Sequence, residues 1–289
     1  MRQHPQKYSA LCIAFQHIAA RTWHRIHNNH TCPISVREDG ITALNLQDLY
    51  QLQLQEFTVI DFTPYVESNA TGADWEWWFM QPGKYFGAAV QAKTLTTAQD
   101  YDIGYVPKNG YPQIRRLLDY SQSKGLTPMY CFYNWWRVPP ARHWPCHSFV
   151  EQEDLWGCAL ADGFNVWKLH LRQKYSLADL NKYTMPWHCI VCCPGYVDGE
   201  PRGQSTRASG IARVLRHQSS TNEPSEPDHE QGNYQEFPEP KIVEELPERI
   251  TILREYVESH EKIGRDLILK LFGETPPRQV ILQGTPEKE

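Results

Sequence analysis

The residues with the clearest potential for chemistry lie between positions 67 and 93. Asp74 precedes an aromatic run, and Gln91 and Lys93 follow after a turn at residues 81–83. Two strands joined by this turn would bring the three side chains to one end of a sheet. A carboxylate, a second oxygen ligand and a lysine in such a place are what metal-assisted cleavage of a phosphodiester bond requires.

The flanking sequence predicts the helices and strands that would position this set. Apolar residues recur at helical spacing in three stretches, which are residues 8–27, 41–55 and 112–124. Four other stretches carry the apolar and β-branched residues that strands favour: 56–66, 73–80, 85–95 and 127–134. Thr42 is a candidate cap for the second helix, and Pro112 and Gly125 bound the third.

The order of these elements predicts an α/β fold with a mixed central sheet flanked by helices, in the sequence α-β-β-β-α-β. The last strand–helix–strand unit, residues 85–134, is normally a right-handed crossover between parallel strands. Residues 135–185 are rich in Trp and His and predict an irregular extension. Residues 186–193 predict a further buried strand.

The C-terminal part of the chain has a different composition. Residues 218–246 are rich in Pro, Glu, Ser and Gln, which predicts a disordered acidic linker. Residues 247–272 predict an amphipathic helix, interrupted near Gly264, that either packs on the domain or joins a second copy as a homodimer. We therefore expect one domain in residues 1–217, then the linker, then a C-terminal helix and tail in residues 247–289.

The composition bears on the location and partners of the chain. It has 289 residues, a net charge of −5 and eight Cys. No apolar run is long enough to cross a membrane and the N-terminus lacks a convincing secretion signal, so we expect a cytoplasmic protein with reduced or metal-bound cysteines. Although the chain is acidic, residues 201–217 contain four Arg and no acid, which is compatible with phosphate binding.

Together these features resemble the PD-(D/E)XK, or restriction-endonuclease-like, superfamily. Its motif is an Asp, followed later by Glu or Gln, any residue, and Lys; here these are Asp74 and Gln91-Ala92-Lys93. The segments GADWEWWF, VQAK and PMYCFYN are also similar to an uncharacterised bacterial family assigned to that fold. The resemblance covers roughly residues 8–195 and implies a restriction-endonuclease-like core.

The resemblance implies a division of roles within the motif. Asp74, the amide oxygen of Gln91 and the main-chain carbonyl of Ala92 would bind a divalent cation, Mg²⁺ or Mn²⁺, through hard oxygen ligands. Lys93 would hold the attacking water and offset the charge that builds on the phosphate. Gln91 departs from the more common Glu, so another acid is needed to restore affinity for the cation.

Three glutamates are candidates for this missing carboxylate. Glu67 lies at the end of the strand before the motif. Glu38 lies before the Leu-rich helix, and the superfamily often takes an acid from its first helix. Glu76 shares a strand face with the motif aspartate. The helix after the motif often contributes a polar residue, so Gln113 and Arg115 are candidates for contact with a phosphate.

Cysteine and histidine residues suggest a competing metal site. Cys189 and Cys192 have the spacing of zinc ligands, and Cys146 and His147 offer a second pair. The apolar residues between Cys189 and Cys192 predict a buried strand instead of the turn that a zinc knuckle needs. Buried cysteines without a metal are common, which favours the structural interpretation.

Aromatic residues near the motif have two interpretations. They could stack on nucleic-acid bases, or they could fill the core. The residues concerned are Trp75, Trp77, Trp78, Trp135 and Trp136. Neighbours on a strand face opposite sides, so we expect Trp75 and Trp77 in the core and leave Trp78 open. Tyr130 and Tyr133 are expected to pack in the core or at its rim.

The expected function is that of a divalent-metal-dependent nuclease, with DNA favoured over RNA as the substrate. A role in defence against foreign DNA is suggested by family analogy alone. One alternative is the same fold without catalysis, used to bind nucleic acid or a protein partner. Another is an interaction protein whose C-terminal helix recruits a partner.

Overall fold

The computed structural model describes residues 10–54, 57–63, 71–81, 83–107, 110–140, 152–192 and 241–284. Several sequence predictions concern residues outside these stretches. They are Glu67, the pair Cys146 and His147, the basic segment 201–217 and residues 218–240 of the predicted linker.

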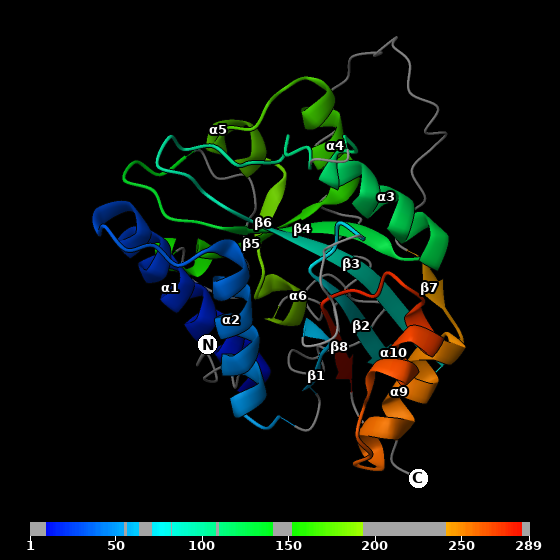
Figure 1. Cartoon of the computed structure of the whole chain (residues 1–289). Coiled ribbons are helices and arrows are strands. Elements are labelled where there is room, and N and C mark those ends of the chain that lie inside the picture. The colour runs from blue at the N-terminus through cyan, green and yellow to red at the C-terminus, as the bar shows by residue number, and fades with distance from the viewer. Residues whose placement is uncertain are drawn as a thin grey trace, which may run out of the picture.

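One mixed β-sheet forms the centre of the described residues (Figure 1). Its strands are β1 (Phe57–Asp61), β2 (Trp75–Gln81), β3 (Lys84–Thr94), β4 (Thr127–Tyr133), β5 (Cys158–Asp162), β6 (Thr184–Pro186), β7 (Ile242–Val243) and β8 (Gln279–Gly284). Their spatial order is β1-β8-β2-β3-β4-β5-β6, and β7 pairs with β3 near its start. The pairs β2–β8 and β3–β4 are parallel, and the other pairs are antiparallel. The predicted α/β class, mixed sheet and parallel crossover are confirmed.

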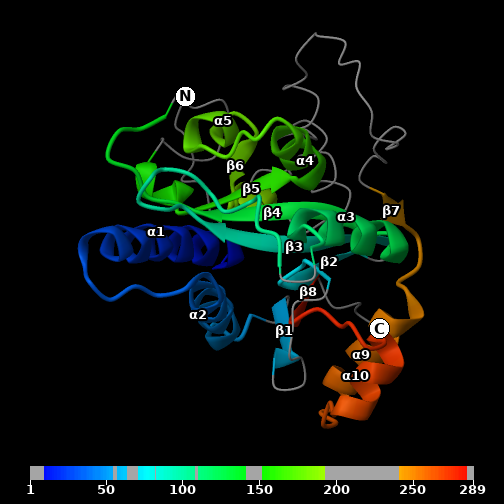
Figure 2. The same cartoon turned by 45° about the horizontal axis from the view of Figure 1, so that its top comes forward.

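Helices flank this sheet on both faces (Figure 2). They are α1 (Ala10–Thr31), α2 (Glu38–Gln51), α3 (Gln113–Lys124), the 3₁₀ helix η2 (Glu153–Trp156), α4 (Gly163–Leu171), α5 (Leu177–Asn181), α6 (Cys189–Cys192), α9 (Glu248–Glu258) and α10 (Arg265–Phe272). None of the helices in the described stretches has the length and apolar character needed to cross a membrane.

Alternation along β2 shows which helices share a face. Trp77 stacks against Phe15 of α1, with ring centroids 5.7 Å apart. The preceding residue, Glu76, accepts hydrogen bonds from Tyr120 of α3 and Arg249 of α9. Because neighbouring side chains on a strand point to opposite faces, α1 lies on one face and α3 and α9 lie on the other.

Helix α2 begins earlier than the sequence predicts. Its N-cap residue is Arg37 and its first residue is Glu38, so the predicted cap at Thr42 is wrong. The acidic first turn, Glu38 and Asp39, suits the positive end of the helix dipole. Thr42 instead lies inside the helix, where its hydroxyl donates to the Glu38 carbonyl and hydrogen-bonds the hydroxyl of Tyr133. The earlier start places Glu38 beside the end of the sheet.

The segment after β4 is more regular than the sequence predicts. Residues 135–185 contain η2, β5, α4 and α5. Asp162 ends β5 and caps α4, because its carboxylate accepts hydrogen bonds from two main-chain N–H groups in the first turn. The predicted strand at 186–193 is also wrong, since β6 ends at Pro186 and residues 189–192 form the helical turn α6. Short apolar runs do not distinguish a buried strand from a buried helix.

Two cysteines that are distant in sequence form a disulfide. Cys12 of α1 and Cys192 of α6 are joined, with their Cα atoms 5.3 Å apart. The prediction that the cysteines are reduced or metal-bound is therefore wrong for this pair. The sequence separation of 180 residues gives no indication of the pairing, which depends on α1 and α6 meeting in the fold.

The C-terminal residues complete the same sheet as the N-terminal ones. Residues 247–289, predicted as a helix and tail, contain α9 and α10, separated at Gly264 as expected, and then strand β8. This strand lies between β1 and β2 and pairs with both. Residues 241–246, assigned by sequence to the linker, include β7, which pairs with β3.

Candidate active site

Asp74 immediately precedes β2 and faces the residues predicted to work with it. Its main-chain N–H donates to the carbonyl oxygen of Val90 at 2.7 Å, which continues the β2–β3 pairing by one residue. Its Oδ2 accepts hydrogen bonds from the Gln91 amide at 2.6 Å and from the Ala92 main-chain N–H at 2.8 Å. The strand pair therefore brings Asp74 and Gln91 together, as the sequence predicts.

A glycine sets the position of this aspartate relative to α3. Gly72 has φ of +75°, which favours glycine over any other residue. A Cβ atom at this position would lie 2.6 Å from the carbonyl oxygen of Gln113 and 2.6 Å from the N–H nitrogen of Leu117. The chain before Asp74 therefore packs directly on the first turn of α3.

Gln113, the first residue of α3, connects the lysine to the rest of the site. The Lys93 ammonium donates to Oε1 of Gln113 at 2.9 Å. The Gln113 amide nitrogen donates in turn to Oε1 of Gln91 at 2.7 Å. A continuous path of hydrogen bonds thus runs from Lys93 through Gln113 and Gln91 to Asp74, and the candidate contact predicted at Gln113 lies within it.

Glu38 reaches the same place from the start of α2. Its Oε1 lies 3.5 Å from the Lys93 ammonium, and its Oε2 accepts a hydrogen bond from the N–H of Thr94 at 2.9 Å. The Lys93 side chain is only 8 % exposed, whereas that of Glu38 is 31 % exposed, so water reaches this ion pair from the glutamate side. Of the candidate acids, Glu38 is the one that the described residues bring to the lysine.

Burial raises the pKa of both carboxyl groups. The pKa of Asp74 is raised by desolvation, against the opposing effects of the Ala92 N–H group and the Lys93 charge. Desolvation raises the pKa of Glu38 to about 7; the charge of Lys93 lowers it, and the charge of Asp74 adds to the rise. Carboxyl groups with pKa values shifted in this way are typical of functional sites, and a nearby cation would favour their ionised forms.

The oxygen atoms around the Gln91 side chain show whether a divalent cation could bind at this place. The Gln91 amide nitrogen is 2.6 Å from Asp74 Oδ2 and 2.9 Å from the carbonyl oxygen of Ala92, so these two oxygens converge. A half-turn of the amide would present its own oxygen to the same point. The three oxygens fit Mg²⁺ or Mn²⁺. Within the described stretches, no group of three or more His, Cys, Asp or Glu could hold a metal ion, so neutral oxygen ligands would have to contribute.

Two other predicted residues have different contacts. Glu76 is fully buried and forms an ion pair of 2.8 Å with Arg249, so its carboxylate is already neutralised within the core. Arg115 forms an ion pair with Asp119, and its guanidinium lies 5.9 Å from the ring of Trp167. The contact of Glu76 is structural, the phosphate contact predicted for the partly exposed Arg115 stays a prediction, and Glu67 lies outside the described residues.

Tyr130 lies beside the site, and no sequence pattern indicates a role for it beyond packing. It pairs with Gln91 across β3 and β4, and its ring is fully buried. Its hydroxyl has no hydrogen-bond partner among the described residues. Burial raises its pKa well above the usual range, and the charges of Glu38 and Asp74 add to the rise. This hydroxyl is an additional candidate donor at the site.

The disulfide bears on the predicted zinc site, and burial bears on the predicted stacking of the tryptophans. Cys192 is in the disulfide with Cys12, so it is not a zinc ligand in this structure. The tryptophans of β2 are 1–2 % exposed and belong to the core, so they do not stack on bases; they are Trp75, Trp77 and Trp78. Trp136 is also buried, whereas Trp135 is partly exposed.

Comparisons with known proteins place the chain in a family. A family model described as "Family of unknown function (DUF6615)" matches residues 11–283, a range that includes Glu38, Asp74, Gln91 and Lys93. A search of curated proteins found no match. A search of solved structures likewise found none. The chain therefore belongs to the DUF6615 family, a family of unknown function.

Proposed function

We propose that the protein is a divalent-metal-dependent nuclease of restriction-endonuclease-like fold that hydrolyses phosphodiester bonds in DNA. The observation that supports this most is the convergence of four predicted residues at the end of β3: Asp74, Gln91, Lys93 and Glu38. They come from α2, β3 and the residue before β2, so their meeting depends on the fold and not on proximity in the chain. A buried aspartate and a partly exposed glutamate beside a lysine suit metal-assisted hydrolysis.

Asp74, the Gln91 amide oxygen and the Ala92 carbonyl would hold the cation. When bound, Mg²⁺ or Mn²⁺ supplies Lewis acidity to the phosphate and lowers the pKa of water. The chain's own contribution is to keep the Asp74 and Ala92 oxygens converged, since the Ala92 N–H and the Gln91 amide fix the Asp74 carboxylate. The Gln91 amide would have to turn, giving up its hydrogen bonds with Asp74 and Gln113, before its oxygen faced the cation.

Lys93 and Glu38 would act on the attacking water. The Lys93 ammonium, fixed by Gln113, orients the water and offsets negative charge on the phosphate. Glu38, whose pKa is about 7, accepts the proton of the water at Oε1. Burial makes this carboxylate more basic than an exposed glutamate, which suits a proton acceptor, and a bound cation would keep it ionised.

Cleavage of DNA by the purified chain in the presence of Mg²⁺ or Mn²⁺ tests the proposal. Lys93→Ala and Asp74→Ala should each lower the rate by about a hundredfold or more. Lys84→Ala is the matched control, since Lys84 is an exposed lysine at the opposite end of β3 and should cut at the wild-type rate. The proposal fails if no DNA is cut with either cation, or if both site variants cut normally.

A second candidate function is binding of nucleic acid without cleavage. The uncharged Gln91 and the small number of acidic ligands within the described residues favour it. In that case the chain would bind DNA with an affinity that falls steeply with salt, and Asp74→Ala would bind as well as the wild type. Cleavage that disappears in Asp74→Ala would exclude this second function.

A further inference from the structure

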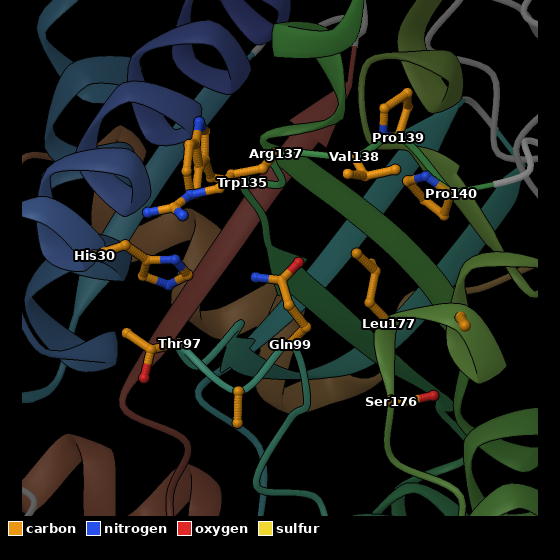
Figure 3. Close-up of a pocket in the computed structure, with 12 residues that line it drawn as sticks. His30, Thr97, Gln99, Trp135, Arg137, Val138, Pro139, Pro140, Ser176 and Leu177 are labelled. Atoms are coloured by element: carbon orange, nitrogen blue, oxygen red, sulfur yellow. The ribbon is translucent and has the colours of Figure 1, made fainter.

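A cavity of about 620 Å³ opens at the C-terminal ends of β3 and β4 (Figure 3). Its described lining comes from four separate segments, which are the end of α1, the turn after β3, the segment after β4 and the start of α5. His30, Gln99, Trp135, Arg137 and Leu177 represent these segments. The carboxyl ends of parallel strands are a common place for ligands in open α/β sheets.

The cavity is next to the candidate active site. Glu38 accepts a hydrogen bond from the N–H of Thr94, and the His30 ring lies 3.0 Å from the carbonyl oxygen of Leu95. Glu38 of the active site and His30 of the cavity wall are thus hydrogen-bonded to adjacent residues, Thr94 and Leu95, whose Cα atoms are about 3.8 Å apart. Thr94 and Leu95 follow directly after Lys93 in the chain. A ligand in the cavity would therefore lie beside the lysine end of β3.

An aromatic and a cationic side chain form one wall. The Trp135 ring is held by His27 and His30, whose ring centroids lie 4.6 Å and 5.4 Å from it. The exposed guanidinium of Arg137 lies over the face of the same ring, 6.0 Å from its centroid. Tryptophan rings and arginine planes are the groups on which unpaired bases stack, and arginine also pairs with phosphate. This wall therefore suits a nucleobase with its attached phosphate.

Gln99 supplies a polar group within the cavity. It has φ of +64°, a left-handed conformation that is strained for a residue other than glycine. Main-chain hydrogen bonds to Thr96 and from Leu177 hold it there. Its side chain lies among the lining residues (Figure 3) and makes no hydrogen bond with any described residue. A carboxamide offers one donor and one acceptor side, which is what the edge of a base requires.

We propose that this cavity binds one unpaired nucleobase of a nucleic-acid strand. The base replaces the Arg137 guanidinium over the Trp135 ring, Gln99 hydrogen-bonds the edge of the base, and the displaced Arg137 pairs with the adjoining phosphate. The inference rests on the proposed function, because a base held here would lie near the end of β3 that carries Lys93. It also specifies the substrate as single-stranded, or as a duplex whose base is turned out of the stack.

Binding without cleavage is the first test. The full chain carrying Asp74→Asn is titrated, in EDTA, into a fluorescent single-stranded oligodeoxynucleotide, and anisotropy is measured. We expect Gln99→Gly and Trp135→Leu in this background to weaken binding by about tenfold. Gln122→Gly, at an exposed glutamine on α3, is the control and should bind normally. An oligonucleotide of abasic sites should bind the parent and the cavity variants equally weakly.

The Gln99→Gly variant separates folding from binding. Glycine adopts positive φ without strain, so this variant should unfold at the same temperature as its parent or higher. Loss of binding with an unchanged Tm would support the cavity as a base site. Equal binding of intact and abasic strands, or normal binding by Gln99→Gly, would overturn it.

The two proposals can fail separately. Base-dependent binding without any metal-dependent cleavage by the wild-type chain would refute the nuclease and leave the cavity assignment intact. Metal-dependent cleavage with unchanged kcat and KM in Gln99→Gly would refute the cavity and leave the nuclease intact.

Discussion

The side-chain amide of Gln91 donates a hydrogen bond of 2.6 Å to Oδ2 of Asp74, which lies 17 residues away in the chain. An amide can do this because it carries N–H groups, whereas a glutamate would place a second negative charge beside the Asp74 carboxylate. The neutral residue therefore keeps the buried site stable without a cation. It also limits the charge that is available to bind one.

Replacing this amide by a carboxylate tests the relationship. Gln91→Glu should lower Tm in EDTA, because two buried carboxylates repel each other. It should also bind Mg²⁺ about tenfold more tightly, because a charged ligand replaces a neutral one. Thermal unfolding at increasing Mg²⁺ concentration measures both effects. Gln122→Glu, on the exposed side of α3, should show neither, and an identical Mg²⁺ dependence in Gln91→Glu would contradict the assigned ligand set.

The pKa of Glu38 predicts how stability depends on pH. Burial raises this pKa from 4.5 to about 7, so the folded state holds the proton more tightly than the unfolded state does. The free energy of unfolding should therefore fall as pH rises from about 5 to 8 in the absence of divalent cations. Glu38→Gln should show a smaller fall, because the substituted amide does not ionise.

Thermal unfolding between pH 5 and pH 8 checks this expectation. Part of the fall should persist in Glu38→Gln, since the pKa of Asp74 is also raised. Glu261→Gln, at an exposed glutamate, should follow the wild-type curve. A Glu38→Gln curve parallel to the wild type would mean that burial does not perturb this carboxyl group.

Alanine substitutions at two glycines that share a left-handed backbone conformation should differ in their effect on stability. Gly72 and Gly83 have φ of +75° and +66°, so alanine at either position costs about 1–2 kcal/mol of strain. At Gly72 the added Cβ would also lie 2.6 Å from main-chain atoms of Gln113 and Leu117, whereas at Gly83 it meets nothing within 4 Å. Overpacking of this kind adds about 1–3 kcal/mol.

Urea unfolding should therefore show a larger loss of stability for Gly72→Ala than for Gly83→Ala. Any catalytic activity should fall only in Gly72→Ala, because that substitution moves Asp74 away from α3. Equal losses in the two variants would show that the contact with α3 does not position the site.

The buried ion pair between Glu76 of β2 and Arg249 of α9 should contribute strongly to stability. Arg249→Met leaves the Glu76 carboxylate without its counter-charge in the core and should destabilise the protein by about 3–5 kcal/mol. Adding Glu76→Gln should recover most of that loss. Arg254→Met removes an ion pair on the outer side of the same helix and should cost less than about 1 kcal/mol. Urea unfolding of these variants would refute the interpretation if the double variant were no more stable than Arg249→Met.

Elements with strong local signals could be predicted from the sequence. The β2–β3 pair has a turn between two strand-like runs, and α3 has an apolar stripe ending at Gly125, whose left-handed conformation closes the helix. The prediction failed where pairing is determined by distant parts of the chain. Strand β8 is short and lies in the predicted tail after the C-terminal helix, and only its contact with β1 and β2 identifies it as a central strand.

The same distinction applies to the site. Asp74, Gln91 and Lys93 follow from a motif on adjacent strands, so local pairing is enough to bring them together. Glu38 could be only one of several candidates, because its position depends on how α2 meets the end of β3. The path through Gln113 depends likewise on the packing of α3. Sequence spacing contains no information about either contact.

The central position of β8 has a consequence for the timing of folding during synthesis. Strand β2, which follows Asp74, has β3 on one side and β8 on the other. A ribosome makes β8 almost 200 residues after β2, so the growing chain exposes an unpaired edge on β2 for most of its synthesis. The Asp74 end of the sheet therefore cannot be completed until the last described strand has emerged. Any activity that depends on the ordered Asp74 site should consequently be absent from an unfinished chain.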